Sequence, residues 1–134
     1  MAIDSKHLEF LQAAITRMAG NSFLVKGWTV TLTTAIIGLA VKDGGRAIAA
    51  LGLLPVAMFA LLDAFYLALE RGFRNRFRIA ARTYVNGDPP DFDMSTGFTA
   101  AALLAALLRP PVLWLHGLLA LVLIGTWLML GSSA

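Results

Sequence analysis

The sequence has 134 residues, of which 58% are hydrophobic and only 14% charged, and its mean hydropathy is +0.74. A soluble domain of this size could not bury so much apolar surface, so we expect lipid to cover part of it. The formal charge of +3 comes mostly from Arg residues gathered in the middle of the chain, so specific recognition of nucleic acid is not expected. The chain has no cysteine, which excludes disulfides and thiolate metal sites.

The segment at residues 1–22 is expected to form an amphipathic helix. Its apolar residues recur at helical spacing (Leu8, Leu11, Ile15 and Met18), and its polar residues take the opposite side (Lys6, Glu9, Thr16 and Arg17). The pattern does not decide whether this helix lies on the membrane surface or packs against the rest of the chain. Asn21 and Ser22 favour a break or a helix cap before the first span. The first apolar run begins only at Phe23, so we expect an uncleaved amino terminus.

Three later apolar runs are long enough to cross a membrane. Residues 23–41 form the first and residues 47–69 the second, and the two make a transmembrane hairpin. The third run lies within residues 110–134, after a Pro-Pro pair that ends an apolar helix at residues 98–109. That shorter helix is not long enough to span. The sequence therefore predicts an all-α membrane protein with three transmembrane helices, and we expect it to assemble into a homo-oligomer.

Residues 70–109 connect the second and third spans. A basic helix is expected to continue from the second span and to end near Asn86, followed by an acidic loop and the short interfacial helix. Four arginines share one face of the basic helix: Arg71, Arg74, Arg78 and Arg82. This face suits anionic lipid headgroups, a phosphate-bearing ligand or an acidic cytoplasmic protein. The positive-inside rule predicts a cytoplasmic amino terminus and basic helix, and a carboxyl terminus outside.

Three ionisable residues fall inside the predicted spans. A lone charge there costs at least about 2.5 to 3.5 kcal/mol, so each needs a partner. Lys26 and Asp63 lie at nearly equal distances along the chain from the turn at Gly44, and His116 falls at a similar depth in the third span. We therefore predict an ion pair between Lys26 and Asp63, with His116 as a third member. This layer either fixes the register of the hairpin or serves as an ion path or proton-sensitive gate.

Small and hydroxyl-bearing residues lie along one side of the first span. Gly27, Thr31, Thr34 and Gly38 share one face, and Thr29 and Thr33 form a neighbouring polar stripe with Lys26. Such residues either let helices approach closely in lipid or line a hydroxyl-bearing pore in an oligomer. Both interpretations predict self-association.

The sequence shows no cluster of residues typical of a catalytic or metal-binding site. A catalytic site would need a nucleophile with a base, a carboxylate pair in a pocket, or metal ligands, and the pattern shows none of these. Asp88, Asp91 and Asp93 occupy a Pro-rich loop, where we expect them to cap helices or neutralise nearby arginines. We expect no enzyme activity, no metal and no cofactor.

Several short motifs resemble a widespread group of small, largely uncharacterised bacterial inner-membrane proteins. They are His7–Gln12, Arg17-Met18, Asn21–Phe23, Lys26–Trp28, Asp63–Leu67, Glu70-Arg71, Phe73-Arg74 and Asp91–Met94. The resemblance implies a bacterial inner-membrane location and favours the pairing of Lys26 with Asp63, but it carries no activity. Small membrane proteins of this general type include antiphage-defence effectors that permeabilise the inner membrane, which is an analogy of architecture alone.

Two functions follow as hypotheses from these features. The leading one is a pore or channel-like membrane effector controlled through its cytoplasmic helices. The alternative is a non-conducting scaffold or adaptor that recruits a cytoplasmic partner or anionic lipid through its basic helix. A transporter subunit is disfavoured, because the sequence shows no inverted repeat or pair of broken helices.

Overall fold

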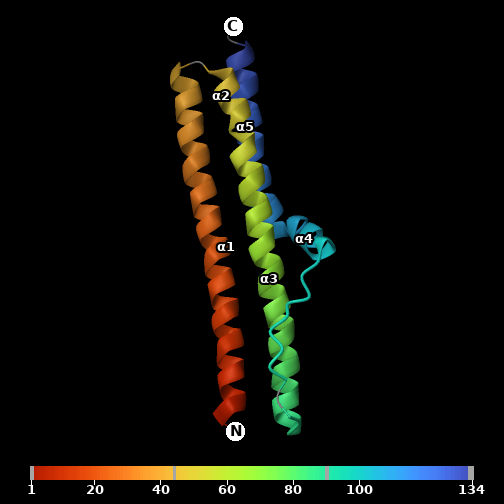
Figure 1. Cartoon of the computed structure of the whole chain (residues 1–134). Coiled ribbons are helices and arrows are strands. Elements are labelled where there is room, and N and C mark those ends of the chain that lie inside the picture. The colour runs from red at the N-terminus through yellow and green to blue at the C-terminus, as the bar shows by residue number, and fades with distance from the viewer. Residues whose placement is uncertain (1, 44, 90, 133–134) are drawn as a thin grey trace.

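The computed structural model describes residues 2–43, 45–89 and 91–132, and the regular structure within them is entirely helical. The helices are α1 (Ala2–Asp43), α2 (Arg46–Leu51), α3 (Leu53–Asn86), α4 (Ala100–Leu107) and α5 (Pro110–Ser132). Helices α1, α3 and α5 run alongside one another (Figure 1).

Three helical stretches are long and apolar enough to cross a membrane. They are Ser5–Asp43, Arg46–Asn86 and Pro110–Ser132. The prediction of an all-α chain with three such helices is therefore confirmed.

The helix α1 is continuous over 42 residues, so the predicted break at Asn21 and Ser22 is wrong. Ser22 does not cap a new helix because its hydroxyl points inward and bonds to Asp63. The apolar stripe of the amino-terminal segment packs against the chain itself, since Leu11 is fully buried and Ala14 nearly so. The expected amphipathic helix is thus the first half of a longer helix.

A two-helix stalk extends beyond the three-helix part of the molecule. At about 1.5 Å per residue, α1 is about 63 Å long, roughly twice the thickness of the hydrocarbon core, whereas α5 is only about 35 Å long. Figure 1 shows α1 and α3 continuing side by side past the start of α5. We call this part, residues 5–22 of α1 and 69–86 of α3, the stalk.

The predicted continuation of the second span into a basic helix is confirmed. Helix α3 runs without interruption to Asn86 and ends on Gly87, whose φ of 74° is left-handed. The amide of this glycine bonds to the carbonyl of Tyr84, which closes the helix.

Within the second span, Gly52 separates α2 from α3, although its backbone stays helical with φ −62° and ψ −21°. Pro55 explains the interruption, because its ring displaces the carbonyl four residues earlier, at Leu51. A Cβ atom added at Gly52 would lie only 2.8 Å from Ile36 Cγ2 and 3.0 Å from Leu123 Cδ2. Gly52 therefore marks a point where α1 and α5 approach the divided span closely.

The short helix α4 covers residues 100–107, somewhat less than the predicted 98–109. Thr99 caps it, because its hydroxyl oxygen accepts a 3.1 Å hydrogen bond from the Ala102 amide. Ala106 of α4 packs against Ala64 and Ala68 of α3. This contact holds α4 beside the three-helix part, near the start of α5 (Figure 1).

Candidate functional site

An ion pair inside the predicted spans joins α1 to α3. Lys26 Nζ lies 2.6 Å from Asp63 Oδ1, and the carboxylate is fully buried. The same ammonium donates a 2.7 Å hydrogen bond to the Ser22 hydroxyl, which in turn donates to Asp63 Oδ1. The predicted contact between Lys26 and Asp63 is therefore present, and Ser22 completes it. Sequence reasoning missed Ser22, although its position four residues before Lys26 places both on one helix face.

His116 of α5 faces the other oxygen of the same carboxylate. Its Nδ1 lies 3.9 Å from Asp63 Oδ2 and 3.0 Å from the Val112 carbonyl. Among the residues that the structure describes, no hydrogen bond reaches Asp63 Oδ2 or His116 Nε2, although both atoms are buried. We call Ser22, Lys26, Asp63 and His116 the polar layer. Asp63 Oδ1 accepts hydrogen bonds from Lys26 and Ser22, whereas Asp63 Oδ2, which faces α5, has no partner among the described residues.

The six residues predicted as a pore or packing face divide between two sides of α1. Thr29 and Thr33 are buried, with exposed fractions of 1% and 2%, so they face the interior of the single chain. The other four (Gly27, Thr31, Thr34 and Gly38) are exposed. We call these four the outer α1 face. Of the two interpretations of this stripe, the burial of Thr29 and Thr33 fits helix packing within the chain, because α1 turns the stripe inward.

In the described part of the chain, no other element covers the two glycines of the outer α1 face. A Cβ added at Gly27 or Gly38 would meet no atom within 4 Å beyond the neighbouring backbone of α1. The hydroxyls of Thr31 and Thr34 bond to the carbonyls of Gly27 and Val30, at 3.0 and 2.9 Å. The outer α1 face is therefore small, polar and open.

The four arginines predicted to share one face of the basic helix differ in burial and in ion pairing. Arg74 Nε pairs with Glu70 Oε1 at 2.7 Å, and Arg71 is half-buried. Arg78 and Arg82 are exposed, and no ion pair involves them within the described part of the chain. Two of the four guanidinium groups thus remain open to a partner.

A fifth arginine, which the helical-wheel reasoning left out, fixes the extended chain that follows the stalk. Arg76 Nε donates to the Ser95 carbonyl at 2.7 Å, and its Nη2 bonds to the carboxylate of Asp93. Thr96 then rests directly on Gly72, where an added Cβ would lie only 2.6 Å from the Thr96 carbonyl oxygen. We call residues 91–99 the strap. The expectation that its acidic residues neutralise a nearby arginine is confirmed for Asp93.

Acid is expected to loosen the strap. The Ser95 backbone amide, the Ser95 hydroxyl and the Arg76 guanidinium together lower the pKa of Asp93 below its usual 3.8, although burial opposes them. A lowered folded-state pKa stabilises the strap above pH 3.8, and this contribution disappears as the pH falls through the lowered pKa.

Hydrogen exchange of residues 91–99 should therefore accelerate only well below pH 4, after correction for intrinsic rates. The Asp93→Asn variant should show fast exchange already at neutral pH. Equal protection of this variant and the wild type at pH 7 would contradict the assignment.

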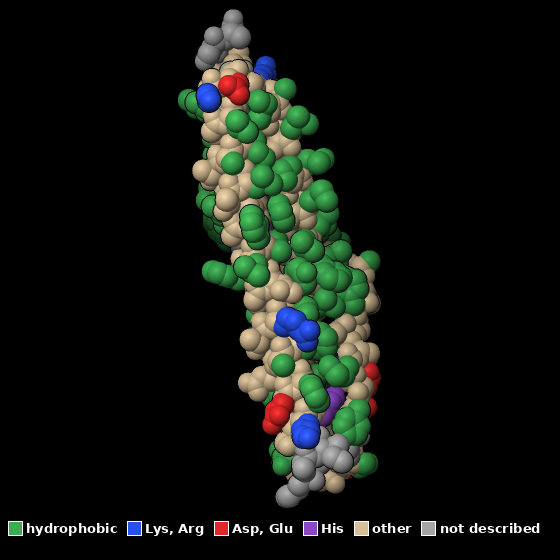
Figure 2. All heavy atoms as spheres, turned by 60° about the vertical axis from the view of Figure 1, so that its left-hand side comes forward, with side chains coloured by type: hydrophobic (Ala, Val, Ile, Leu, Met, Phe, Trp, Pro, Cys, Tyr) green, Lys and Arg blue, Asp and Glu red, His purple; other side chains and the backbone are tan. Residues whose placement is uncertain are grey.

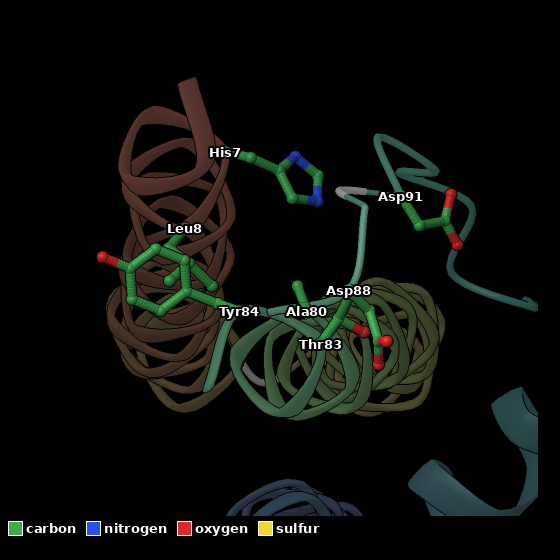
Figure 3. Close-up of a pocket in the computed structure, with 7 residues that line it drawn as sticks. All are labelled: His7, Leu8, Ala80, Thr83, Tyr84, Asp88 and Asp91. Atoms are coloured by element: carbon green, nitrogen blue, oxygen red, sulfur yellow. The ribbon is translucent and has the colours of Figure 1, made fainter. Parts of the chain in front are cut away.

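Figure 3 shows a pocket at the end of the stalk. His7 projects from α1 toward the extended chain at Asp91, while Thr83 comes from the last turns of α3 and Asp88 from the chain just after it. The His7 ring meets Phe92 edge to face, with 5.4 Å between ring centroids. The cavity measures only about 10 Å³, enough for about one water molecule. The described residues also contain no group of three potential metal ligands. This pocket is therefore a packing feature of the strap.

Comparison with family models, curated proteins and solved structures finds no match to this chain. The resemblance to small bacterial inner-membrane proteins consequently stays a prediction.

Proposed function

We propose that this chain is a self-assembling, channel-like effector of the bacterial inner membrane, controlled through its stalk. The amino terminus and the stalk lie in the cytoplasm and the carboxyl terminus lies outside. The distribution of basic residues supports this orientation, because the stalk carries five arginines of α3 and the opposite end carries Lys42 and Arg46.

The outer α1 face is the observation that carries the proposal. A helix surface in contact with lipid is normally apolar, and faces of glycine and threonine are typical of contacts between helices. The chain has turned Lys26, Thr29 and Thr33 inward but leaves this second polar face outside. Figure 2 shows the α1 side of the molecule. Backbone and side chains that are neither hydrophobic nor charged (tan) are exposed there between the hydrophobic side chains (green). Further copies of the chain are the natural cover for it.

A path for ions follows if α1 faces the axis of the assembly. Each threonine hydroxyl donates to its own helix and retains lone pairs that accept from water or approach a cation. Thr31 and Thr34 from several copies would then surround a narrow polar path. The polar layer ties α1 to α3 beside the stalk, so a displacement of the stalk is transmitted along the continuous α1 helix.

Ion flux from liposomes tests this function with one matched pair of double variants. Replacing Thr31 and Thr34 by Val keeps side-chain volume but removes the hydroxyls, and we expect flux to fall several-fold while the assembly stays intact. Replacing the buried Thr29 and Thr33 by Val is the control, and we expect flux close to that of the wild type. Unchanged flux in the Thr31 and Thr34 variant would contradict the proposed path.

The alternative, a non-conducting adaptor, is favoured by a different observation. Arg78 and Arg82 project from the stalk without an ion pair among the described residues, in a position to meet an acidic cytoplasmic protein. For an adaptor, reversing both charges should abolish capture of the partner without changing assembly. An assembled wild type that conducts no ions at any protein density would favour this function over the channel.

A further inference from the structure

A groove on the stalk combines side chains of both helices. It has a volume of about 470 Å³ and lies between α1 and α3. Helix α1 contributes Gln12, Ile15 and Thr16, and α3 contributes Arg74, Phe77 and Arg78. The groove thus brings amide, hydroxyl and guanidinium groups together with two apolar side chains.

The charges in this groove favour an anion. Arg78 is exposed and forms no ion pair within the described residues, so its guanidinium is open. Arg74 is held by Glu70, whose carboxylate would have to give up part of this contact to an incoming anion. Two arginines against one glutamate leave one positive charge. The fork of a guanidinium group matches the oxygens of a phosphate, which it binds through paired hydrogen bonds.

The remaining lining residues suit the rest of such a ligand. The amide group of Gln12 offers two further donors, and the Thr16 hydroxyl, which donates to the Gln12 carbonyl at 3.0 Å, keeps its acceptor positions. Phe77 and Ile15 form an apolar wall. The volume exceeds what a phosphate group alone needs, so the groove accommodates the body to which the phosphate is attached.

The position of the groove limits where the phosphate comes from. The predicted second span ends at residue 69, and Arg74 lies five residues beyond it, about 7.5 Å along α3. The headgroup layer adds only about 5 to 8 Å on each side of the hydrocarbon core. The groove therefore lies near the outer edge of the headgroups, where it meets both lipid phosphates and phosphate compounds dissolved in the cytoplasm.

We propose that this groove is a binding site for a phosphate-bearing anion, held by Arg78 and Arg74 of α3 with Gln12 of α1. The site bridges the two stalk helices, so occupancy stiffens the stalk. The proposal does not rest on the channel, because binding is measurable whether or not the assembly conducts.

Two probes distinguish the sources of the phosphate. Inorganic pyrophosphate is titrated by calorimetry into the protein in nanodiscs of phosphatidylcholine. Retention of phosphatidylglycerol is measured by native mass spectrometry in mixed nanodiscs. Saturable binding of either probe at one site per chain is the expected result.

Three single variants locate the site. Arg78→Gln should weaken binding about tenfold, as expected for the loss of a charge-assisted hydrogen bond. Glu70→Gln should tighten it several-fold, because Arg74 is then free. Arg82→Gln, which removes an exposed arginine of the same helix outside the groove, should change it less than about twofold.

If Arg78→Gln loses the binding of pyrophosphate but keeps the lipid, the site belongs to a soluble phosphate compound. If Arg78→Gln loses the retention of lipid but still binds pyrophosphate, the site belongs to a lipid headgroup. The proposal is overturned if neither probe binds saturably, or if Arg82→Gln weakens binding as much as Arg78→Gln does. In the latter case the stalk would attract anions only through its overall charge. Because Arg78 and Arg82 are exposed, neither substitution should disturb folding, which circular dichroism can verify.

Discussion

Replacing Lys26 by Met is expected to destabilise the helix packing by about 3 to 5 kcal/mol. The Asp63 side chain, with an exposed fraction of 0%, would then be buried without its counter-charge. Only the Ser22 hydroxyl would remain to bond its Oδ1 atom. The free energy of unfolding, measured by titration with sodium dodecyl sulfate in mixed micelles, gives the loss directly.

A double variant separates the charge from the loss of packing. Replacing Lys26 by Met and Asp63 by Leu together removes both charges and keeps apolar volume, so most of the lost stability should return. A double variant that is no more stable than Lys26→Met would show that the ion pair is not the origin of the effect. Equal stability of Lys26→Met and the wild type would contradict the burial of Asp63 in the folded chain.

Replacing Gly27 and Gly38 by Leu is expected to dissociate the assembly while leaving each chain folded. Among the described residues, a Cβ at either glycine would meet no atom within 4 Å beyond the neighbouring backbone of its own helix, so the single chain has room for the new side chains. Between two copies, the same side chains would hold the helix backbones apart. Sedimentation in detergent should show a smaller particle with unchanged helix content.

The Gly52→Leu variant is the control, because it places the same side chain at a glycine inside the chain. A side chain at Gly52 collides with Ile36 and Leu123 inside the chain, and overpacking of this kind typically costs about 1 to 3 kcal/mol. This variant should lose stability of the single chain. If Gly27 and Gly38 variants lost stability in the same way, the outer α1 face would belong to the internal packing.

Depth along the membrane was readable from the sequence. Counting residues from the turn at Gly44 placed Lys26 and Asp63 at one level, because both helices rise by the same distance per residue. The long continuation of α3 was also predictable, since its periodicity stays helical up to Asn86 and Gly87 supplies a left-handed end. Each of these inferences uses only local geometry.

The rotation of α1 about its own axis, which decides which of its stripes faces α3, could not be predicted from local geometry. The sequence shows two polar stripes on α1, and nothing local decides which of them meets α3. The structure turns Thr29 and Thr33 inward, beside Lys26, and leaves Thr31 and Thr34 outside. The buried charge pair settles this choice, because Lys26 can reach Asp63 only when its own side of α1 faces α3.

Long-range contacts account for the other differences. The break expected at Asn21 and Ser22 is absent because the partner of Ser22 lies 41 residues away on α3. The role of Arg76 depends on a strap that returns along the stalk, which a helical wheel does not represent. The separation of α2 from α3 at Gly52 had a local signal in Pro55, which lies four residues after Leu51 and interrupts the apolar run.

The mass of the wild-type assembly in nanodiscs, measured by native mass spectrometry, tests the central proposal most directly. The proposed channel requires a closed ring of four or more copies of the 14.3 kDa chain, held through the outer α1 face. A monomer would contradict it, since the three spans of one chain cannot enclose an aqueous path.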